Sequence, residues 1–207
     1  DISGRRSWNS KQIFEELEDH KLKVGSISSM NVINKLKKPC YFIPDPWTDT
    51  KSDNSYFSKI TTKILKDAVN NNASGKISFL NYFYLILIFF KFVRIKKYFF
   101  FINYLLSSFS KRWRKALFLD LLIHEIHLNL LKKNKPNFSS VFFNAGAHIQ
   151  HHYLLNSLAN PSNIKNPEHI LSKNEDPFKE MLLVYEEILK DYFNDHKNII
   201  LATGLTQ

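Results

Sequence analysis

The sequence lacks the residues and motifs that mark several classes of protein. Cys40 is the single cysteine among 207 residues, so no internal disulfide framework can form. The chain has no glycine-rich phosphate loop, no GxSxG nucleophile elbow and no Cys–His pair, which argues against the chemistry that these motifs support. No apolar run reaches the roughly 20 residues that a transmembrane helix needs. The length and a hydrophobic content of 44% indicate one globular domain, or the larger part of one, with a sizeable core.

Acidic residues are absent from the whole stretch between Asp67 and Asp120. The net charge of the chain is +10, and nine basic residues in this stretch account for most of it. They are Lys76, Lys91, Arg94, Lys96, Lys97, Lys111, Arg112, Arg114 and Lys115. The basic character is therefore local, and it does not indicate a specific nucleic-acid-binding protein.

The same stretch is crowded with aromatic residues, in segments 79–93 and 97–106. One interpretation is a pair of buried helices joined at residues 94–97. A second is a hairpin at 79–115 that enters a membrane interface, with its lysines and arginines on anionic lipid headgroups. A third is nucleic-acid binding through basic and stacking side chains.

Hydrophobic periodicity and turn-forming residues predict an alternation of helices and strands. We expect helices at 7–21 (N-cap Ser10), 55–72, 112–135 and 176–196, strands at 22–28, 40–44, 137–143 and 198–203, and a loop at 44–55. This alternation predicts an α/β fold with a mainly parallel sheet flanked by helices. Residues 1–207 would form part of a single such domain, with a helical basic and aromatic-rich insertion at 74–115.

Polar segments follow three of the predicted strands, at 44–49, 144–153 and 203–207. Ligands of parallel sheets bind beyond the carboxyl ends of the strands, so we expect these segments to share one rim. Aspartates of the first segment also suit self-capping turns, and Trp47 is unusual in a loop unless it packs or stacks on a ligand. The candidate substrate-binding residues are Asp45, Trp47, Asn144, Gln150 and Gln207.

Three histidines lie within five positions of the segment "NAGAHIQHHY". On a helix that begins near Ala147, His148 is spaced from His151 by i+3 and from His152 by i+4. Such pairs can chelate a divalent metal, with zinc as the usual choice, but a tight site needs a further ligand. Capping and hydrogen bonding at the rim is the alternative. The similar segment "HEIH" (124–127) is not HExxH and lies in an apolar helix, which favours a core or surface polar role.

Four segments in order, at 8–31, 41–47, 135–157 and 198–207, resemble the alkaline-phosphatase-like superfamily, and within it the type I phosphodiesterase/nucleotide pyrophosphatase-like branch. The resemblance implies an alkaline-phosphatase-like fold and a hydrolase of phosphate or sulfate esters. It implies two divalent metals, usually zinc, and a Ser or Thr nucleophile, which we expect in a longer protein upstream of Asp1. The basic and aromatic-rich insertion suggests that the substrate is glycan- or lipid-linked.

The resemblance also assigns residues one by one. His151 matches the metal-binding histidine of the family, and His148 matches the histidine that often follows an aspartate ligand. Ala147 stands where that aspartate is expected, and Gly204 and Leu205 stand where an Asp-His pair is expected. We therefore expect an altered site, rebuilt from Asn144, His148, Gln150, His151 and His152.

Two other functions stay open from the sequence. One is a non-catalytic glycan- or anion-binding protein on the same scaffold. The other is a peripheral membrane-surface protein, which leaves the location open between the cytoplasm and the membrane surface of a bacterial-type cell.

Overall fold

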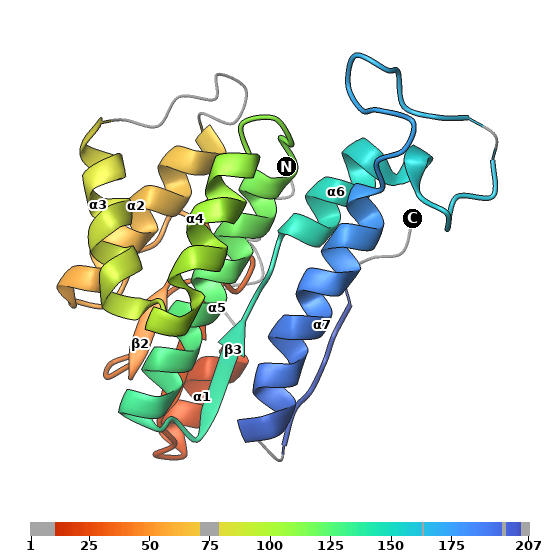
Figure 1. Cartoon of the computed structure of the whole chain (residues 1–207). Coiled ribbons are helices and arrows are strands. Elements are labelled where there is room, and N and C mark those ends of the chain that lie inside the picture. The colour runs from red at the N-terminus through yellow and green to blue at the C-terminus, as the bar shows by residue number, and fades with distance from the viewer. Residues whose placement is uncertain (1–10, 71–78, 163, 196–197, 204–207) are drawn as a thin grey trace. The chain divides into compact units, whose positions relative to one another are not determined.

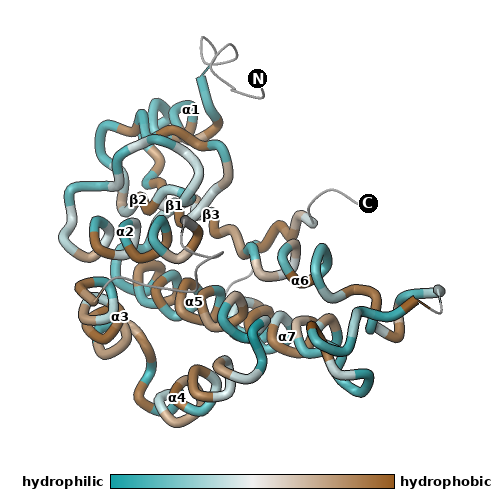
Figure 2. Tube along the Cα trace, turned by 90° about the horizontal axis from the view of Figure 1, so that it is seen from above, coloured by the Kyte–Doolittle hydropathy of each residue, from teal (hydrophilic) through white to brown (hydrophobic). Residues whose placement is uncertain are grey.

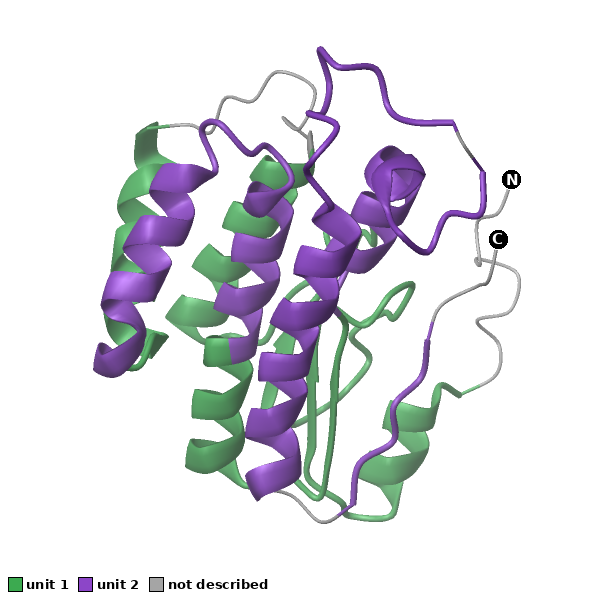
Figure 3. Ribbon diagram, turned by 45° about the vertical axis from the view of Figure 1, so that its right-hand side comes forward, with its two compact units in different colours: residues 1–94, 125–142 green, residues 95–124, 143–207 purple. Residues whose placement is uncertain are grey.

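The computed structural model describes residues 11–70, 79–162, 164–195 and 198–203 (Figure 1). The chain divides into two compact units, which Figure 3 colours separately. Unit 1 comprises residues 1–94 and 125–142, and unit 2 comprises residues 95–124 and 143–207. Helix α5 (Arg114–Asn134) gives its first part to unit 2 and its last part to unit 1.

Unit 1 contains a small sheet of three parallel strands, which confirms the predicted α/β class and the parallel sheet. The strands are β1 (Val24–Ile27), β2 (Tyr41–Ile43) and β3 (Phe138–Val141), in the order β2-β1-β3. β1 and β2 are buried along their whole length, as parallel strands usually are, whereas β3 is half-buried. The helices of unit 1 are α1 (Ile13–Asp19), α2 (Tyr56–Asn70), α3 (Phe79–Phe92) and the last part of α5.

A row of three residues crosses the sheet at Gly25. Tyr41 on β2 and Ser139 on β3 are both in register with Gly25 on β1. The phenol ring of Tyr41 lies over Gly25, and its hydroxyl reaches Ser139 Oγ at 2.6 Å. A methyl group built on Gly25 would lie 2.6 Å from Cε2 of that ring. The position therefore requires glycine because the ring occupies the space of a side chain.

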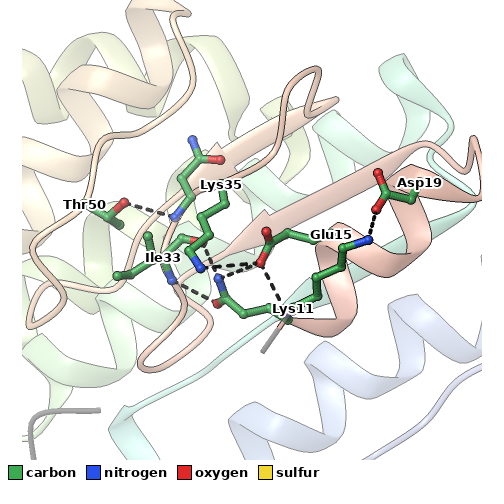
Figure 4. Close-up of polar contacts among 8 residues, drawn as sticks. Lys11, Glu15, Asp19, Ile33, Lys35 and Thr50 are labelled. Atoms are coloured by element: carbon green, nitrogen blue, oxygen red, sulfur yellow. Dashed lines mark hydrogen bonds and ion pairs between the residues drawn. The ribbon is translucent and has the colours of Figure 1, made fainter. Parts of the chain in front are cut away.

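The loop after β1 is tied to α1 and to the loop after β2 (Figure 4). The side chain of Gln12 accepts the backbone N–H of Ile33 at 3.1 Å and donates to its carbonyl at 3.1 Å. The backbone N–H of Asn34 donates to Thr50 Oγ1 at 3.0 Å. Glu15 accepts the backbone N–H of Gln12 at 3.0 Å, which stabilises the first turn of α1. These contacts fix the loops that follow the carboxyl ends of β1 and β2.

The regular elements of unit 2 are helices in the described residues. It contains the 3-10 turn η2 (Ile95–Lys97), α4 (Tyr98–Ser107), the first part of α5, α6 (Ala145–Tyr153), the 3-10 turn η3 (Leu154–Asn156) and α7 (Pro177–Asp195). Glu180 on α7 joins three elements, because it accepts hydrogen bonds from the Tyr104 hydroxyl, Trp113 Nε1 and Arg114 Nε at 2.7–2.8 Å. Asp176 accepts the backbone N–H of Lys179 and so caps the start of α7.

Replacement of Glu180 by alanine is expected to lower the free energy of unfolding by about 1–2 kcal/mol, because buried Tyr104 and Trp113 lose their acceptor. Urea denaturation followed by circular dichroism measures the change. Glu186→Ala is the matched control, because Glu186 is exposed on the same helix and should change stability by less than about 0.5 kcal/mol. Equal losses in both variants would contradict the joining role of Glu180.

Most of the predicted elements are present, with shifts of a few residues at their ends. Segment 198–203 is a correction, because it is not a strand. A strand needs a partner for its backbone groups, and the side chains of Ile200 and Leu201 are 92% and 63% exposed. The prediction of Ser10 as the N-cap is wrong, because the N-cap residue of α1 is Gln12. Ser10 itself and residues 74–78 of the predicted insertion lie outside the described residues.

The apolar segments of the insertion do form two helices, α3 and α4, joined by η2. The interpretation that both are buried is wrong for one side of each helix, since Phe79, Phe83 and Phe90 on α3 and Phe99 and Leu106 on α4 are 54–91% exposed. Both helices are largely hydrophobic (Figure 2). Each has buried residues on one side only, so the other side stays in contact with solvent. Among the described residues, no helix combines the length and the apolar character that crossing a membrane requires.

Candidate functional site

Helix α6 begins on a buried carboxylate. Asp120, in the part of α5 that belongs to unit 2, is 2% exposed. It accepts the backbone N–H groups of Asn144 at 3.2 Å and Ala145 at 2.8 Å. The Tyr185 hydroxyl donates to Asp120 at 2.8 Å and accepts the backbone N–H of Gly146 at 2.7 Å. The first N–H groups of a helix lack partners within the helix and carry partial positive charge, so Asp120 both satisfies and orients the start of α6.

Burial away from water determines the electrostatics of the contacts that Asp120 and Tyr185 make with the start of α6, which we call the α6 anchor. Burial raises the pKa of the Asp120 carboxyl from 3.8 to about 6, although its three hydrogen bonds act in the opposite direction. Burial also raises the pKa of the Tyr185 phenol, and the neighbouring Asp120 raises it further. A methyl group on Gly146 would lie 3.2 Å from the Tyr185 ring, so the helix start leaves little room for a larger residue. Asp120, Tyr185 and Gly146 together hold α6 in one position within unit 2.

The predicted metal ligands lie on this anchored helix. Buried Ile149 and Tyr153 set its rotation, which leaves His148 half-buried and both His151 and His152 exposed. The ring centroids of His148 and His152 are 4.7 Å apart, as their i, i+4 spacing predicts. Burial lowers the pKa of His148, and the nearby His152 and His151 lower it further. His148 therefore offers a neutral imidazole at neutral pH, which is the form that binds metals.

The other predicted residues of this segment have different surroundings. Asn144 is the N-cap residue of α6, but its side chain makes no capping hydrogen bond, so the carboxylate of Asp120 replaces it in that role. Gln150 is half-buried on α6, and Ala147, at the position of the expected aspartate, is exposed. The helix begins at Ala145, slightly earlier than predicted. Gln207 lies outside the described residues.

Asp45 and Trp47 follow the carboxyl end of β2 in unit 1. The Asp45 carboxylate is fully buried and accepts the backbone N–H groups of Asn31, Trp47 and Thr48 together with the Thr48 hydroxyl. It thus connects the loop after β2 with the loop after β1, and direct contact with a substrate stays a prediction for this residue. The side chain of Trp47 is 50% exposed, and its backbone N–H donates a hydrogen bond to the Asp45 carboxylate at 2.9 Å.

The residues of "HEIH" are confirmed as buried polar residues. His124 Nε2 contacts Asp191 Oδ2 at 2.9 Å in unit 2. In unit 1 Glu125 accepts hydrogen bonds from the Arg94 backbone and guanidinium, and His127 Nε2 contacts Ser139 Oγ at 2.8 Å. Each side chain therefore has a partner that justifies its burial.

Two polar groups were not predicted from the sequence. The sequence gives one indication of the role of Asp120, because it is a lone acidic residue in the apolar run "ALFLDLLI". A charge that is buried in such a run needs a polar partner. The chain of contacts from Tyr41 through Ser139 to His127 carries no local signal, because it joins residues far apart in the sequence.

The candidate metal ligands that the structure brings together within one unit are pairs of side chains, and both pairs lie in unit 2. Within either unit taken by itself, the described residues bring no three His, Cys, Asp or Glu side chains close enough to hold one ion. Unit 2 provides the His148–His152 pair on α6 and the His124–Asp191 contact. The first pair is the more accessible, because His124 is 2% exposed.

Comparisons of this chain with family models, with curated proteins and with solved structures give no match.

Proposed function

We propose that this chain belongs to a metal-dependent hydrolase of phosphate or sulfate esters with an alkaline-phosphatase-like fold and an altered metal site. The observation that carries the proposal is the His148–His152 pair on a helix with a fixed start. The parallel sheet supports it, since β2 and β3 both lead, at their carboxyl ends, into the polar segments of the predicted rim.

The donor set fits a divalent metal of the zinc type. Imidazole nitrogens at i, i+4 can chelate such an ion, and His148 needs to lose no proton because its pKa is lowered. When bound, the metal would stabilise the negative charge that develops on the ester oxygens. Asp120 acts as a positioning residue, because its hydrogen bonds to the first turn of α6 fix where the histidines stand within unit 2. His151 is the third candidate ligand, on the resemblance.

Titration of this chain with Zn²⁺ in a calorimeter tests the proposal. We expect His148→Ala and His152→Ala each to weaken zinc binding at least tenfold, because a lone histidine chelates poorly. His169→Ala is the matched control, since His169 is an exposed histidine of unit 2 that lies outside α6. The absence of zinc binding by the unsubstituted chain, or equal losses in all three variants, would contradict the site.

Turnover is tested separately on the complete gene product, because the resemblance assigns the nucleophile to no residue of this chain. Hydrolysis of 4-nitrophenyl phosphodiester and sulfate probes should require added zinc and should fall with His148→Ala. His151→Ala decides whether the resemblance assigns that residue correctly: joint loss of zinc binding and turnover supports it.

A non-catalytic binding protein on the same scaffold is the second candidate. The observation that favours it is Ala147, which provides no carboxylate where the resemblance places a metal ligand. This candidate predicts binding of an anionic ligand without stoichiometric zinc and without turnover of either probe.

A further inference from the structure

The outward side of α4 and the turn after it carry exposed apolar side chains, which we call the α4 face. It consists of Phe99, Ile102, Leu106 and Phe109, which are 78%, 50%, 60% and 76% exposed. The i, i+3, i+7 spacing of Phe99, Ile102 and Leu106 places them on one side of α4, and Phe109 lies in the turn that follows. Figure 2 shows α4 as a largely hydrophobic segment.

The opposite side of α4 is packed, so the α4 face has a defined direction within unit 2. Phe101 is 1% exposed, and its ring lies 5.6 Å from that of Phe118 on α5. Tyr104 is 8% exposed and donates its hydroxyl to Glu180 on α7. The helix therefore cannot turn its apolar side inward without breaking these contacts.

Positive charge flanks both ends of the α4 face. Lys96 and Lys97 precede α4, and Lys111, Arg112 and Lys115 follow it. No acidic residue occurs in the sequence between these two groups or among them. Lys111 forms an ion pair with Glu175 at 3.4 Å, and among the described residues Lys96, Arg112 and Lys115 have no ion pair of their own.

We propose that the α4 face binds the surface of an anionic lipid bilayer. An apolar helix side between cationic ends is the arrangement of helices that lie in the plane of a membrane interface. The apolar residues would enter the boundary between headgroups and acyl chains, and the flanking cations would contact anionic headgroups. At about 1.5 Å per residue, the ten residues of α4 extend about 15 Å, which suits a helix lying along the surface rather than crossing it.

Charge favours this occupant over a second copy of the chain or a nucleic acid. Two copies that met through the α4 face would bring their positive ends near one another, and like charges oppose such contacts. Bases stack on aromatic rings, whereas Ile102 and Leu106 are aliphatic and gain nothing from stacking.

Flotation with vesicles tests the proposal. We expect the chain to float with vesicles of phosphatidylcholine and phosphatidylserine, and to float far less with phosphatidylcholine alone or at high salt. Phe99→Asp combined with Leu106→Asp should lower the bound fraction at least tenfold, and Lys96→Glu combined with Lys97→Glu should also lower it. Leu182→Asp combined with Phe193→Asp is the matched control, because these two exposed apolar residues lie on α7 of the same unit. This control should bind like the unsubstituted chain.

Three results would overturn the proposal. They are the absence of flotation with anionic vesicles at low salt, an equal loss in the α7 control, and a stable dimer without lipid that the Phe99→Asp and Leu106→Asp changes dissociate. The assay needs no added metal, and His148→Ala should float like the unsubstituted chain. Its outcome is therefore independent of the proposed hydrolase function.

Discussion

Replacement of Gly25 by alanine is expected to lower the free energy of unfolding by roughly 3 kcal/mol. The added methyl group would lie 2.6 Å from a ring carbon of Tyr41, and the ring cannot move away without losing its contact with Ser139. Tyr41 is 2% exposed in the centre of unit 1, so the surrounding core resists its displacement. Urea denaturation of both proteins, followed by far-ultraviolet circular dichroism, measures the loss.

A double-mutant cycle identifies the cause of that loss. In a Tyr41→Leu background the shorter side chain does not cover position 25, so Gly25→Ala should cost much less than in the unsubstituted protein. Tyr41→Phe keeps the ring and removes the hydroxyl, and it should cost about 1 kcal/mol through the lost contact with Ser139. An equal cost of Gly25→Ala in both backgrounds would show that the ring is not responsible.

The contribution of Asp120 to stability is expected to fall as the pH rises from about 4 to about 6. The folded protein holds the proton of Asp120 more tightly than the unfolded chain, because burial raises the pKa to about 6 from 3.8. The contribution is therefore complete below the unfolded pKa and is lost as the pH rises through the folded pKa. A difference of about two pH units corresponds to roughly 3 kcal/mol.

Comparison with Asp120→Asn isolates this contribution, since asparagine stays neutral throughout. We expect the stability of the unsubstituted protein relative to the variant to fall across that pH window, as measured by urea denaturation at several pH values. Asp195→Asn, at an exposed aspartate of α7, is measured in the same way as the matched control for removal of one carboxyl group. A constant difference between the unsubstituted protein and Asp120→Asn at all pH values would show that Asp120 titrates alike in both states.

Local patterns in the sequence predicted the helices and strands better than they predicted how these elements pair and pack. The apolar run before Pro44 predicted β2, because a strand that is buried on both sides needs consecutive apolar residues, whereas β3 is half-buried and has two serines between its apolar ends. The run at 198–203 is also largely apolar and is not a strand. Composition alone cannot say whether a partner strand is available, and pairing is what makes a strand.

The candidate site was predictable where spacing along one helix decides the geometry. The approach of the His148 and His152 rings follows from the i, i+4 spacing, and it was expected. The contacts of Asp120, Gly146 and Tyr185 that hold α6 were not expected. These residues come from three helices, and the sequence does not show that the helices are neighbours. The role of Asp45 was expected in part, since aspartates cap turns locally, but its bond to Asn31 depends on the pairing of β1 with β2.

The order of pairing in the sheet has a consequence for folding during synthesis. The central strand β1 pairs with β2 soon after both are made, but its other side pairs with β3, where Val24 lies opposite Phe138. Everything from β2 to the end of α5 must leave the ribosome before that pairing can form. Closing so long a loop is slow, and one edge of β1 stays open to other chains meanwhile. We therefore expect aggregation to be most favoured during translation, in the interval when this edge of β1 has no partner strand.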